Sequence, residues 1–401
     1  MMGVVSNQQE NLMKHLLIAR GLRACADGYA AVLLPAYLLT LGFGRWEVGL
    51  ISTATLLGSA LMTLALGAWG HMLPRDRLLP AAALLMVGTG LGIAGFSGWW
   101  PLLLVGFIGT LNPGAGDVSI FLPLEHARIA TVVEGEARTR LFARYSLIGT
   151  LCAALGALAA AAPDVLANIG VARLDSLRGM FLLYGLAGFT VWLIYWYQPV
   201  SADRKDIQST PLGPSRGIVV RLALLFAVDA FAGGLVVNSL LALWLLDRFG
   251  LSLAATGAFF FWSGLLTAMS QLLAPWVAKK IGLLNTMVFT HIPANLFLIL
   301  AAFAPAWSWA LTFLLLRGLL SQMDVPTRSA YVMAVVTPAE RTAAASFTAV
   351  PRSLASATGP ALSGVLLGLG WLGLPLIVCG LMKIIYDLAL WRSFRRYKIN
   401  S

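Results

Sequence analysis

Apolar runs of about twenty residues recur along the whole chain, and short polar segments separate them. A helix of that length crosses the roughly 30 Å hydrocarbon layer of a bilayer, so each run is a candidate membrane span. A backbone in lipid must satisfy its own hydrogen bonds, which favours helices throughout. We therefore predict an all-α integral membrane protein. The pattern indicates twelve transmembrane helices, at residues 16–41, 46–69, 79–96, 99–124, 140–162, 177–198, 218–246, 252–277, 284–304, 306–335, 343–369 and 371–391.

The longest polar segment divides these helices into two sets of six. It reads QPVSADRKDIQSTPLGPSRG and is rich in Pro and Ser, as expected for a linker. Asp117 and Asp324 lie 207 residues apart, and Gly42 and Gly250 lie 208 residues apart, which indicates an internal repeat. We expect two six-helix pseudo-repeats, at residues 1–198 and 218–401, joined by a cytoplasmic linker at 199–217.

The composition agrees with a lipid environment. Of the 401 residues 59% are hydrophobic and 11% are charged, whereas about 25% of a soluble domain is charged. The net charge of +11 comes from Lys and Arg spread over many short loops, which argues against a nucleic-acid partner. With both termini cytoplasmic, 18 of these residues lie on the inner side and four on the outer side. This asymmetry predicts that orientation.

Charged side chains inside the predicted spans are the candidate functional residues, because each costs a few kcal/mol at the bilayer centre. Those that we expect to bind substrate or couple protons are Asp27, Asp229, Asp117, Asp324, Arg23, Arg317 and Arg328. Further charged residues deep in the spans include Arg20, Arg352, Lys383 and Asp387.

Two interpretations of these charges remain open. Asp27 and Asp229 lie near the middle of their predicted helices, at a depth of roughly 16 Å, where a buried carboxylate is a candidate proton carrier. Alternatively, the charges pair along one helix face and only stabilise packing. Arg23 with Asp27, Asp324 with Arg328, and Lys383 with Asp387 all have the i,i+4 spacing of such pairs.

Polar residues at the end of the fourth predicted helix suggest a water boundary. Glu125, His126 and Arg128 are expected to form a solvated cap or a gate there. The stretch NPGAG at 112–116 is expected to break this helix just before Asp117, since Pro and Gly disfavour a helix interior.

Several kinds of chemistry have no support in the sequence. His71, His126 and His291 are far apart in the chain, so no metal site is predicted. A phosphate-binding G-x-x-x-x-G-K-[ST] loop is absent, which argues against ATP as the energy source. A clustered nucleophile and base are also absent, so the sequence predicts neither an enzyme nor a cofactor.

With twelve predicted spans in two sets of six and a long central loop, the chain resembles the major facilitator superfamily over nearly its whole length. The family's signature loop, roughly G-x-x-x-D-R-x-G-R-R, is similar to GAWGHMLPRDRLL, which begins at Gly67. Arg75 and Arg77 match it, whereas His71 stands where the family has an acid, so the resemblance does not carry over the latch assigned to that acid. GPALSG (359–364) and RGLLSQ (317–322) resemble antiporter motifs but lie in other helices than usual.

The resemblance implies a function and a site. Helices 1, 4, 7 and 10 of the family line a central cavity, and here each of them carries one of the four aspartates. The expected function is secondary active transport of a small molecule by alternating access, as proton-coupled export. The alternative is proton-coupled import of a small organic solute, for which an anion is one option. Two further alternatives are a transporter-fold sensor and a membrane-embedded enzyme. The sensor would need a signalling domain and the enzyme a catalytic cluster, and neither is visible in the sequence.

The implied partners are the solute, protons and the lipid bilayer. We expect a monomer in a bacterial-type cytoplasmic (inner) membrane. The repeat also places Asp117 opposite Asp324, near the cytoplasmic side. Asp117 has no basic residue at i+3 or i+4, so we expect this pair to form a proton-sensitive cytoplasmic gate in which Asp117 is the more sensitive member.

Overall fold

The computed structural model describes residues 2–69, 72, 74–114, 119–132, 135–197, 213–337 and 340–397. Within these ranges the chain forms helices and no strand, in agreement with the all-α prediction. Nine helices in the described ranges are long and apolar enough to cross a membrane, and Trp99–Ile108 is a shorter apolar helix. The chain divides into two compact units. The count of twelve spans and the repeat boundaries at 198 and 218 stay predictions.

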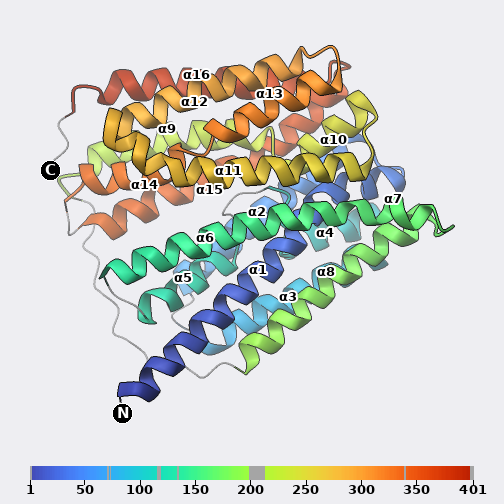
Figure 1. Cartoon of the computed structure of the whole chain (residues 1–401), viewed down its shortest axis with the longest axis horizontal. Helices are drawn as coiled ribbons and strands as arrows, with labels where there is room; N and C mark the ends of the chain where they lie inside the picture. The colour runs from blue at the N-terminus through green and yellow to red at the C-terminus, as the bar shows by residue number, and fades with distance from the viewer. Residues whose placement is uncertain are drawn as a thin grey trace. The chain divides into compact units, whose positions relative to one another are not determined.

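Unit 1 consists of Met1–Gly44, Ala54–Lys205 and Leu251–Phe261. Its helices are α1 (Met2–Thr40), α3 (Arg75–Gly95), α4 (Trp99–Ile108), α5 (Phe121–Val132), α6 (Gly135–Leu158), the 3-10 turn η2 (Ala159–Ala161), α7 (Ala162–Ala167) and α8 (Arg173–Trp196). It also contains the second part of α2 (Arg45–Trp69) and the first turns of α11 (Leu253–Ile281). Within this unit α1 packs along α6, and α3 packs along α8 (Figure 1).

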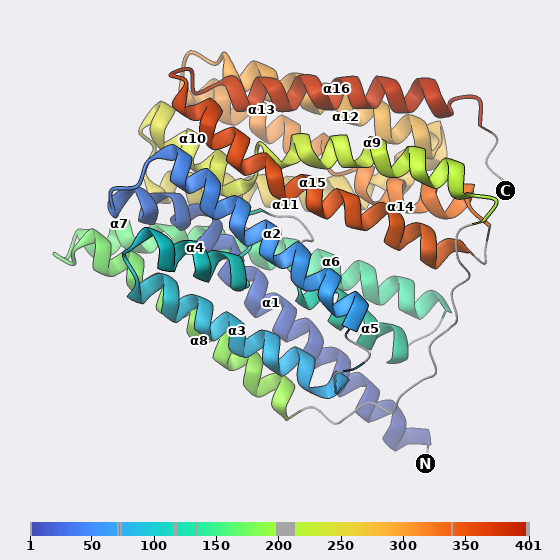
Figure 2. The ribbon, with the colours of Figure 1, turned by 180° about the vertical axis from the view of Figure 1, so that it is seen from behind.

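Unit 2 consists of Arg45–Thr53, Asp206–Gly250 and Trp262–Ser401. Its helices are α9 (Arg216–Gly234), α10 (Asn238–Phe249), α12 (Leu283–Ala302), α13 (Trp307–Leu320), α14 (Asp324–Val335), α15 (Arg341–Gly368) and α16 (Leu374–Phe394). Helix α9 lies between α15 and α16, and it packs against both (Figure 2). Helix α12 packs against α13, α14 and α16.

Three of the predicted helices are each divided in two. The predicted helix 99–124 ends at Ile108 and resumes at Phe121, and the Gly114 N–H donates to the Asn112 side chain at 3.2 Å within the break. The predicted helices 218–246 and 306–335 are interrupted at residues 235–237 and 321–323. The break near NPGAG agrees with the prediction, whereas the other two were not predicted.

Glycines allow close contact between helices inside each unit. A methyl group on Gly156 would lie 2.0 Å from the Cys25 carbonyl oxygen, so α6 meets α1 backbone to backbone. One on Gly90 would lie 2.4 Å from the Gly185 nitrogen, where α3 meets α8. Within GPALSG, Gly359 meets Gly234 of α9 in the same way. Small residues at such contacts are typical of membrane helices.

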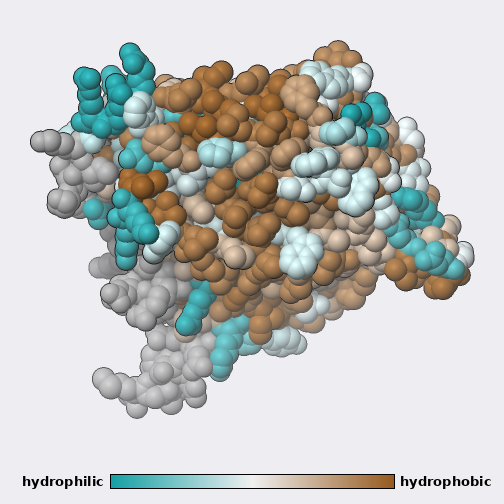
Figure 3. Space-filling model, turned by 45° about the horizontal axis from the view of Figure 1, so that its top comes forward, coloured by the Kyte–Doolittle hydropathy of each residue, from teal (hydrophilic) through white to brown (hydrophobic). Residues whose placement is uncertain are grey.

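Large apolar side chains on the outer helix faces are exposed, including Leu272, Leu300 and Ile385. Figure 3 shows one face that is hydrophobic over most of its area, with hydrophilic side chains gathered at its two ends. A soluble protein rarely exposes such a large apolar surface, so we interpret it as the surface that meets lipid.

Candidate functional site

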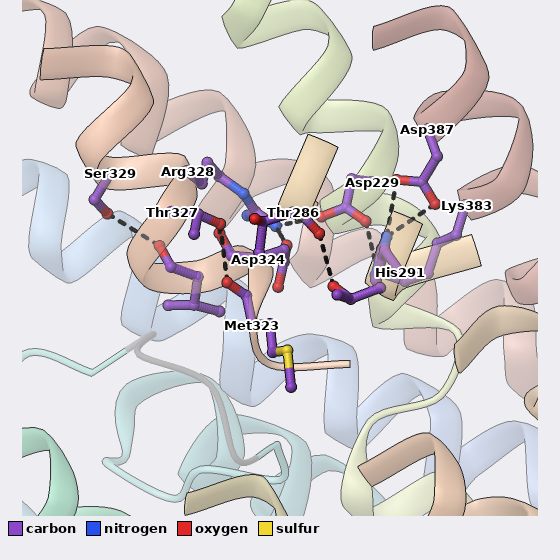
Figure 4. Close-up of polar contacts among 12 residues, drawn as sticks. Asp229, Thr286, His291, Met323, Asp324, Thr327, Arg328, Ser329, Lys383 and Asp387 are labelled. Atoms are coloured by element: carbon purple, nitrogen blue, oxygen red, sulfur yellow. Dashed lines mark hydrogen bonds and ion pairs between the residues drawn. The ribbon is translucent and has the colours of Figure 1, made fainter. Parts of the chain in front are cut away.

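A group of buried charged side chains surrounds Asp229 of α9 in unit 2. The Lys383 ammonium of α16 lies 2.6 Å from one Asp229 oxygen, and the Arg328 guanidinium of α14 lies 3.1 Å from the other. Arg328 also pairs with Asp324, one turn earlier in its own helix. We call Asp229, Asp324, Arg328 and Lys383 the Asp229 cluster. Figure 4 shows Asp229 between its two cationic partners.

The Asp229 cluster tests two of the predicted helix-face pairs. The Asp324–Arg328 pair is present, as the i,i+4 spacing predicted. The Lys383–Asp387 pair was wrong, because Lys383 instead contacts Asp229. These residues are at most 8% exposed, and a buried ion needs a partner of opposite charge. The closest acid for Lys383 comes from a neighbouring helix, which the spacing along one helix does not reveal.

Asp387 has a different partner on α12. The His291 Nδ1 atom lies 3.0 and 3.1 Å from the two Asp387 oxygens, and both side chains are buried. Figure 4 shows this pair beside Lys383. From the sequence, His291 was considered only as a possible metal ligand, and its contact with Asp387 has no signal there.

Arg317 of α13 and Arg352 of α15 are further cations in unit 2. The Nε atom of each is buried and has no hydrogen-bond partner in the part of the chain that the structure describes. No carboxylate of the described residues lies within ion-pair distance of either guanidinium. Both nevertheless interact with the Asp229 carboxylate at longer range.

Unit 1 contains a buried ion pair between α1 and α5. The Arg23 guanidinium lies 2.5 Å from the Glu125 carboxylate, and the two side chains are 2% and 0% exposed. The hydroxyls of Tyr145 and Tyr195 also donate to this carboxylate. The Arg23 guanidinium stacks at 3.9 Å from the Phe121 ring centroid.

This ion pair corrects two expectations. Glu125 is not a solvated cap at a water boundary, since it is fully buried. Arg23 pairs with Glu125 and not with Asp27. Tyr145 and Tyr195, which complete the contacts of Glu125, are visible in the sequence only as phenols inside apolar runs. A buried phenol generally needs a partner for its hydroxyl, which is the one available signal.

Asp27 of α1 is bound by a neutral group. The Tyr184 hydroxyl lies 3.2 Å from its carboxylate and also contacts Thr110, at the end of α4. Arg20 and Arg23 act on this carboxylate only from beyond ion-pair distance. Among the described residues, Asp27 therefore differs from Asp229 in having no cation in direct contact.

Some predicted residues cannot be placed in these groups. Asp117 and His71 lie outside the described residues, so the predicted Asp117–Asp324 gate and the signature-loop interpretation stay predictions. Asp324 itself belongs to the Asp229 cluster through Arg328. In the described ranges, no three His, Cys, Asp or Glu side chains converge as metal ligands would.

The geometry thus consists of membrane helices with buried carboxylates and arginines, and a family model agrees with it. The model described as Major Facilitator Superfamily matches residues 16–322, more than half of the chain. The chain belongs to the Major Facilitator Superfamily. The resemblance seen in the sequence is thereby confirmed, and the fold is that of the family's transporters.

The three similar proteins named here are distant in sequence. Uncharacterized membrane protein YJR124C of Saccharomyces cerevisiae is 25% identical over 407 residues, which cover 92% of this chain and 91% of the relative. A bacterial homolog of the human lysosomal transporter Spinster, solved inward-facing and unoccupied, has a TM-score of 0.73 at 16% identity, with 97% of this chain and 98% of that chain covered. A D-xylose-proton symporter has a TM-score of 0.74 at 15% identity, with 96% and 97% covered. The two structural likenesses show the fold alone.

Proposed function

We propose that the protein is a secondary active transporter that moves a small molecule across the membrane by alternating access and is driven by protons. Family membership supports transport. Proton coupling is supported by the buried carboxylates and by analogy with the structurally similar D-xylose-proton symporter.

The observation that carries the proton-coupling proposal is the difference between Asp27 and Asp229. Asp229 is held by Lys383 and Arg328, so adding a proton to it breaks two ion pairs. Asp27 has the neutral Tyr184 hydroxyl as its partner, so a proton can bind without breaking an ion pair. A carboxylate in an apolar interior is also costly to keep ionised without a cation. We therefore propose Asp27 as the main proton carrier and Asp229 as the charge that organises unit 2.

The proposed direction is export, because residues 359–364 and 317–322 resemble antiporter segments. Import by proton symport is the alternative. The two differ in a direct measurement. Antiport accumulates solute on the acidic side of an imposed pH gradient, whereas symport accumulates it on the alkaline side.

The proposal is tested with purified protein in proteoliposomes, with an imposed pH gradient and a panel of labelled solutes. Asp27→Asn should reduce gradient-driven accumulation more than tenfold and leave solute exchange at equal pH measurable, since only the proton site is lost. Asp229→Asn should also lose accumulation, with a lower yield of folded protein because Lys383 and Arg328 lose a partner.

The matched control is Asp175→Asn, an exposed acid at the start of α8. It should transport like the wild type. Unchanged pH-driven accumulation in Asp27→Asn, in Asp229→Asn and in the double variant would contradict the assignment of the proton sites. Failure of every solute to respond to a proton gradient would contradict the proposed function itself.

A further inference from the structure

The interior of unit 2 contains more permanent positive charge than its carboxylates neutralise. Arg328 and Lys383 are buried cations of its described helices, and Arg317 and Arg352 are partly buried ones. The buried carboxylates near them are Asp229, Asp324 and Asp387. Asp387 is occupied by His291. Asp229 and Asp324 are occupied by Arg328 and Lys383. Each of these carboxylates therefore has a partner, and the guanidinium groups of Arg317 and Arg352 have no ion-pair partner among the described residues.

Arg317 is in the last turn of α13, where the helix is interrupted before α14 begins. Its backbone carbonyl accepts a hydrogen bond from the Ser321 N–H, so the backbone there is fixed. The ionisable groups that act on its guanidinium are Cys379 of α16 and Asp229, and neither is in hydrogen-bond contact with it. The helix C-terminus is a weak counter-charge that stabilises a cation only partly.

Arg352 is in a less favourable position. The strongest electrostatic effect on its guanidinium is repulsion by Arg328, and the attractions of Asp229 and Asp324 are weaker. Its Nε atom is buried without a partner in the described ranges. A partly buried charge in a membrane helix that is repelled by another and has no ion-pair partner is costly unless water or a ligand satisfies it.

Arginine at this position favours one ligand chemistry. The guanidinium is a planar fork that binds a carboxylate or a phosphate with two parallel hydrogen bonds. A neutral sugar or nucleoside offers no charge to compensate two cations. Arg328 is less available for such a ligand, because Asp229 and Asp324 already occupy it.

We infer that Arg317 and Arg352 form a binding site for a small organic anion, which carries a carboxylate or phosphate group and is the transported solute. This inference rests on the proposed transport function and names its substrate class. Arg317 and Arg352 bind the anion, and the Asp229 cluster keeps Arg328 and Lys383 neutralised beside it.

The test uses the full-length protein in nanodiscs of neutral phosphatidylcholine. The probes are benzoate, citrate and glycerol 3-phosphate, with benzamide and glycerol as uncharged counterparts. Binding is measured by isothermal titration calorimetry and by the shift in thermal unfolding. We expect at least one anion to bind and stabilise the wild type, and the uncharged counterparts to have no effect.

The variants Arg317→Gln and Arg352→Gln should each weaken anion binding about tenfold or more, since a charge-assisted hydrogen bond is lost. Arg317→Lys and Arg352→Lys keep the positive charge, so these variants should fold even where the glutamine variants do not. They should bind the anion more weakly than the wild type, because lysine lacks the planar fork. The matched control is Arg392→Gln, an exposed arginine in the last turn of α16, which should bind like the wild type.

Three results would overturn the inference. The first is pH-driven transport of an uncharged solute with no anion binding, which leaves the proposed function intact. The second is equal binding by the Arg317→Gln, Arg352→Gln and Arg392→Gln variants. The third comes from nanodiscs with phosphatidylglycerol: stabilisation by this lipid, lost in the variants and without binding of any free anion, would assign the arginines to a lipid headgroup.

Discussion

Among single residues, the Arg23–Glu125 pair shows how strongly a buried charge depends on its partner. Glu125 receives the Arg23 guanidinium and two tyrosine hydroxyls in a site that is closed to solvent. Removal of one member of such a pair leaves the other unpaired and costs about 3–5 kcal/mol, whereas removal of both charges can be nearly neutral.

We therefore predict that Glu125→Gln lowers the stability of the protein by about 3–5 kcal/mol. The double variant Arg23→Gln with Glu125→Gln should recover much of this loss, because two amides can hydrogen-bond without a net charge. Thermal unfolding in detergent measures both. A double variant that is less stable than Glu125→Gln alone would mean that Arg23 is stabilised by other groups.

The same residues show what could be predicted from the sequence. The Asp324–Arg328 pair was found because both side chains lie on one helix face, where an i,i+4 spacing is sufficient. The spacing failed for Arg23 and Lys383, since another helix brings a closer carboxylate to each of them. A charged residue in a span could be recognised as important from the sequence, but its partner depends on tertiary packing.

For helices and their breaks, the local sequence was informative only in part. The break after α4 carries Pro113 and Gly114, two residues that disfavour a helix, and it was predicted. The break between α13 and α14 falls at Ser321–Met323, and Pro326 follows it in the first turn of α14. Pro326 has no N–H to donate to the Gln322 carbonyl, so a helix-breaking residue also marks this break. The break between α9 and α10 follows Gly233 and Gly234, and glycines in membrane helices more often mark close contacts.

The start of α9 is joined to the turn between α14 and α15 by Glu340. Its carboxylate accepts hydrogen bonds from the Gly213 N–H and, at 2.6 Å each, from the Ser215 and Thr337 hydroxyls. These donors favour the ionised form and lower the pKa of Glu340 from 4.5 to about 2, and the Ser215 hydroxyl has the largest effect.

The lowered pKa gives a prediction for pH dependence. The folded state binds the Glu340 proton less tightly than the unfolded state, so this contribution to stability is present above pH 4.5 and is lost as the pH falls towards 2. Glu340→Gln should lower the unfolding temperature at pH 7, and the difference from the wild type should shrink by pH 3. A difference that is constant from pH 7 to pH 3 would show that ionisation of Glu340 does not contribute.

At the scale of the whole molecule, the class of protein could be predicted from the sequence pattern, without reference to particular residues. The apolar runs predict a membrane protein, and the family model and the structure confirm this. The positions of the two compact units could not be derived in the same way. Residues 45–53 of α2 belong to unit 2, where Thr53 accepts a hydrogen bond from the Ala361 N–H at 2.8 Å. A contact between residues 308 positions apart leaves no periodic signal.

The two proposals also bear on the direction of transport. An anion bound by Arg317 and Arg352 adds negative charge near Asp229, and a proton on a carboxylate removes negative charge. For a proton on Asp229, anion and proton would therefore favour each other, which argues for symport. Export, proposed from the antiporter-like segments, instead requires that the anion and the proton on Asp27 are bound in different steps. The side of accumulation in proteoliposomes distinguishes the two.

Orientation in the membrane follows from the distribution of charge over the whole chain. With both termini inside, the inner loops hold 18 Lys and Arg and the outer loops hold four, and such an excess marks the cytoplasmic side. We predict that the termini and the linker at 199–217 are cytoplasmic and that the loop at 96–98 is external. The test replaces Cys25, Cys152 and Cys379 by alanine and introduces single cysteines, as Ser97→Cys or Ser209→Cys.

A membrane-impermeant maleimide applied to intact cells should label the cysteine at 97 and leave the one at 209 unlabelled until the membrane is permeabilised. Ser97 is a suitable position because it is exposed, although its hydroxyl accepts a 2.7 Å hydrogen bond from Arg178 that the substitution removes. The cysteine-free protein without either substitution controls for background labelling. External labelling at 209 but not at 97 would reverse the orientation, and with it the proposed direction of every transport step.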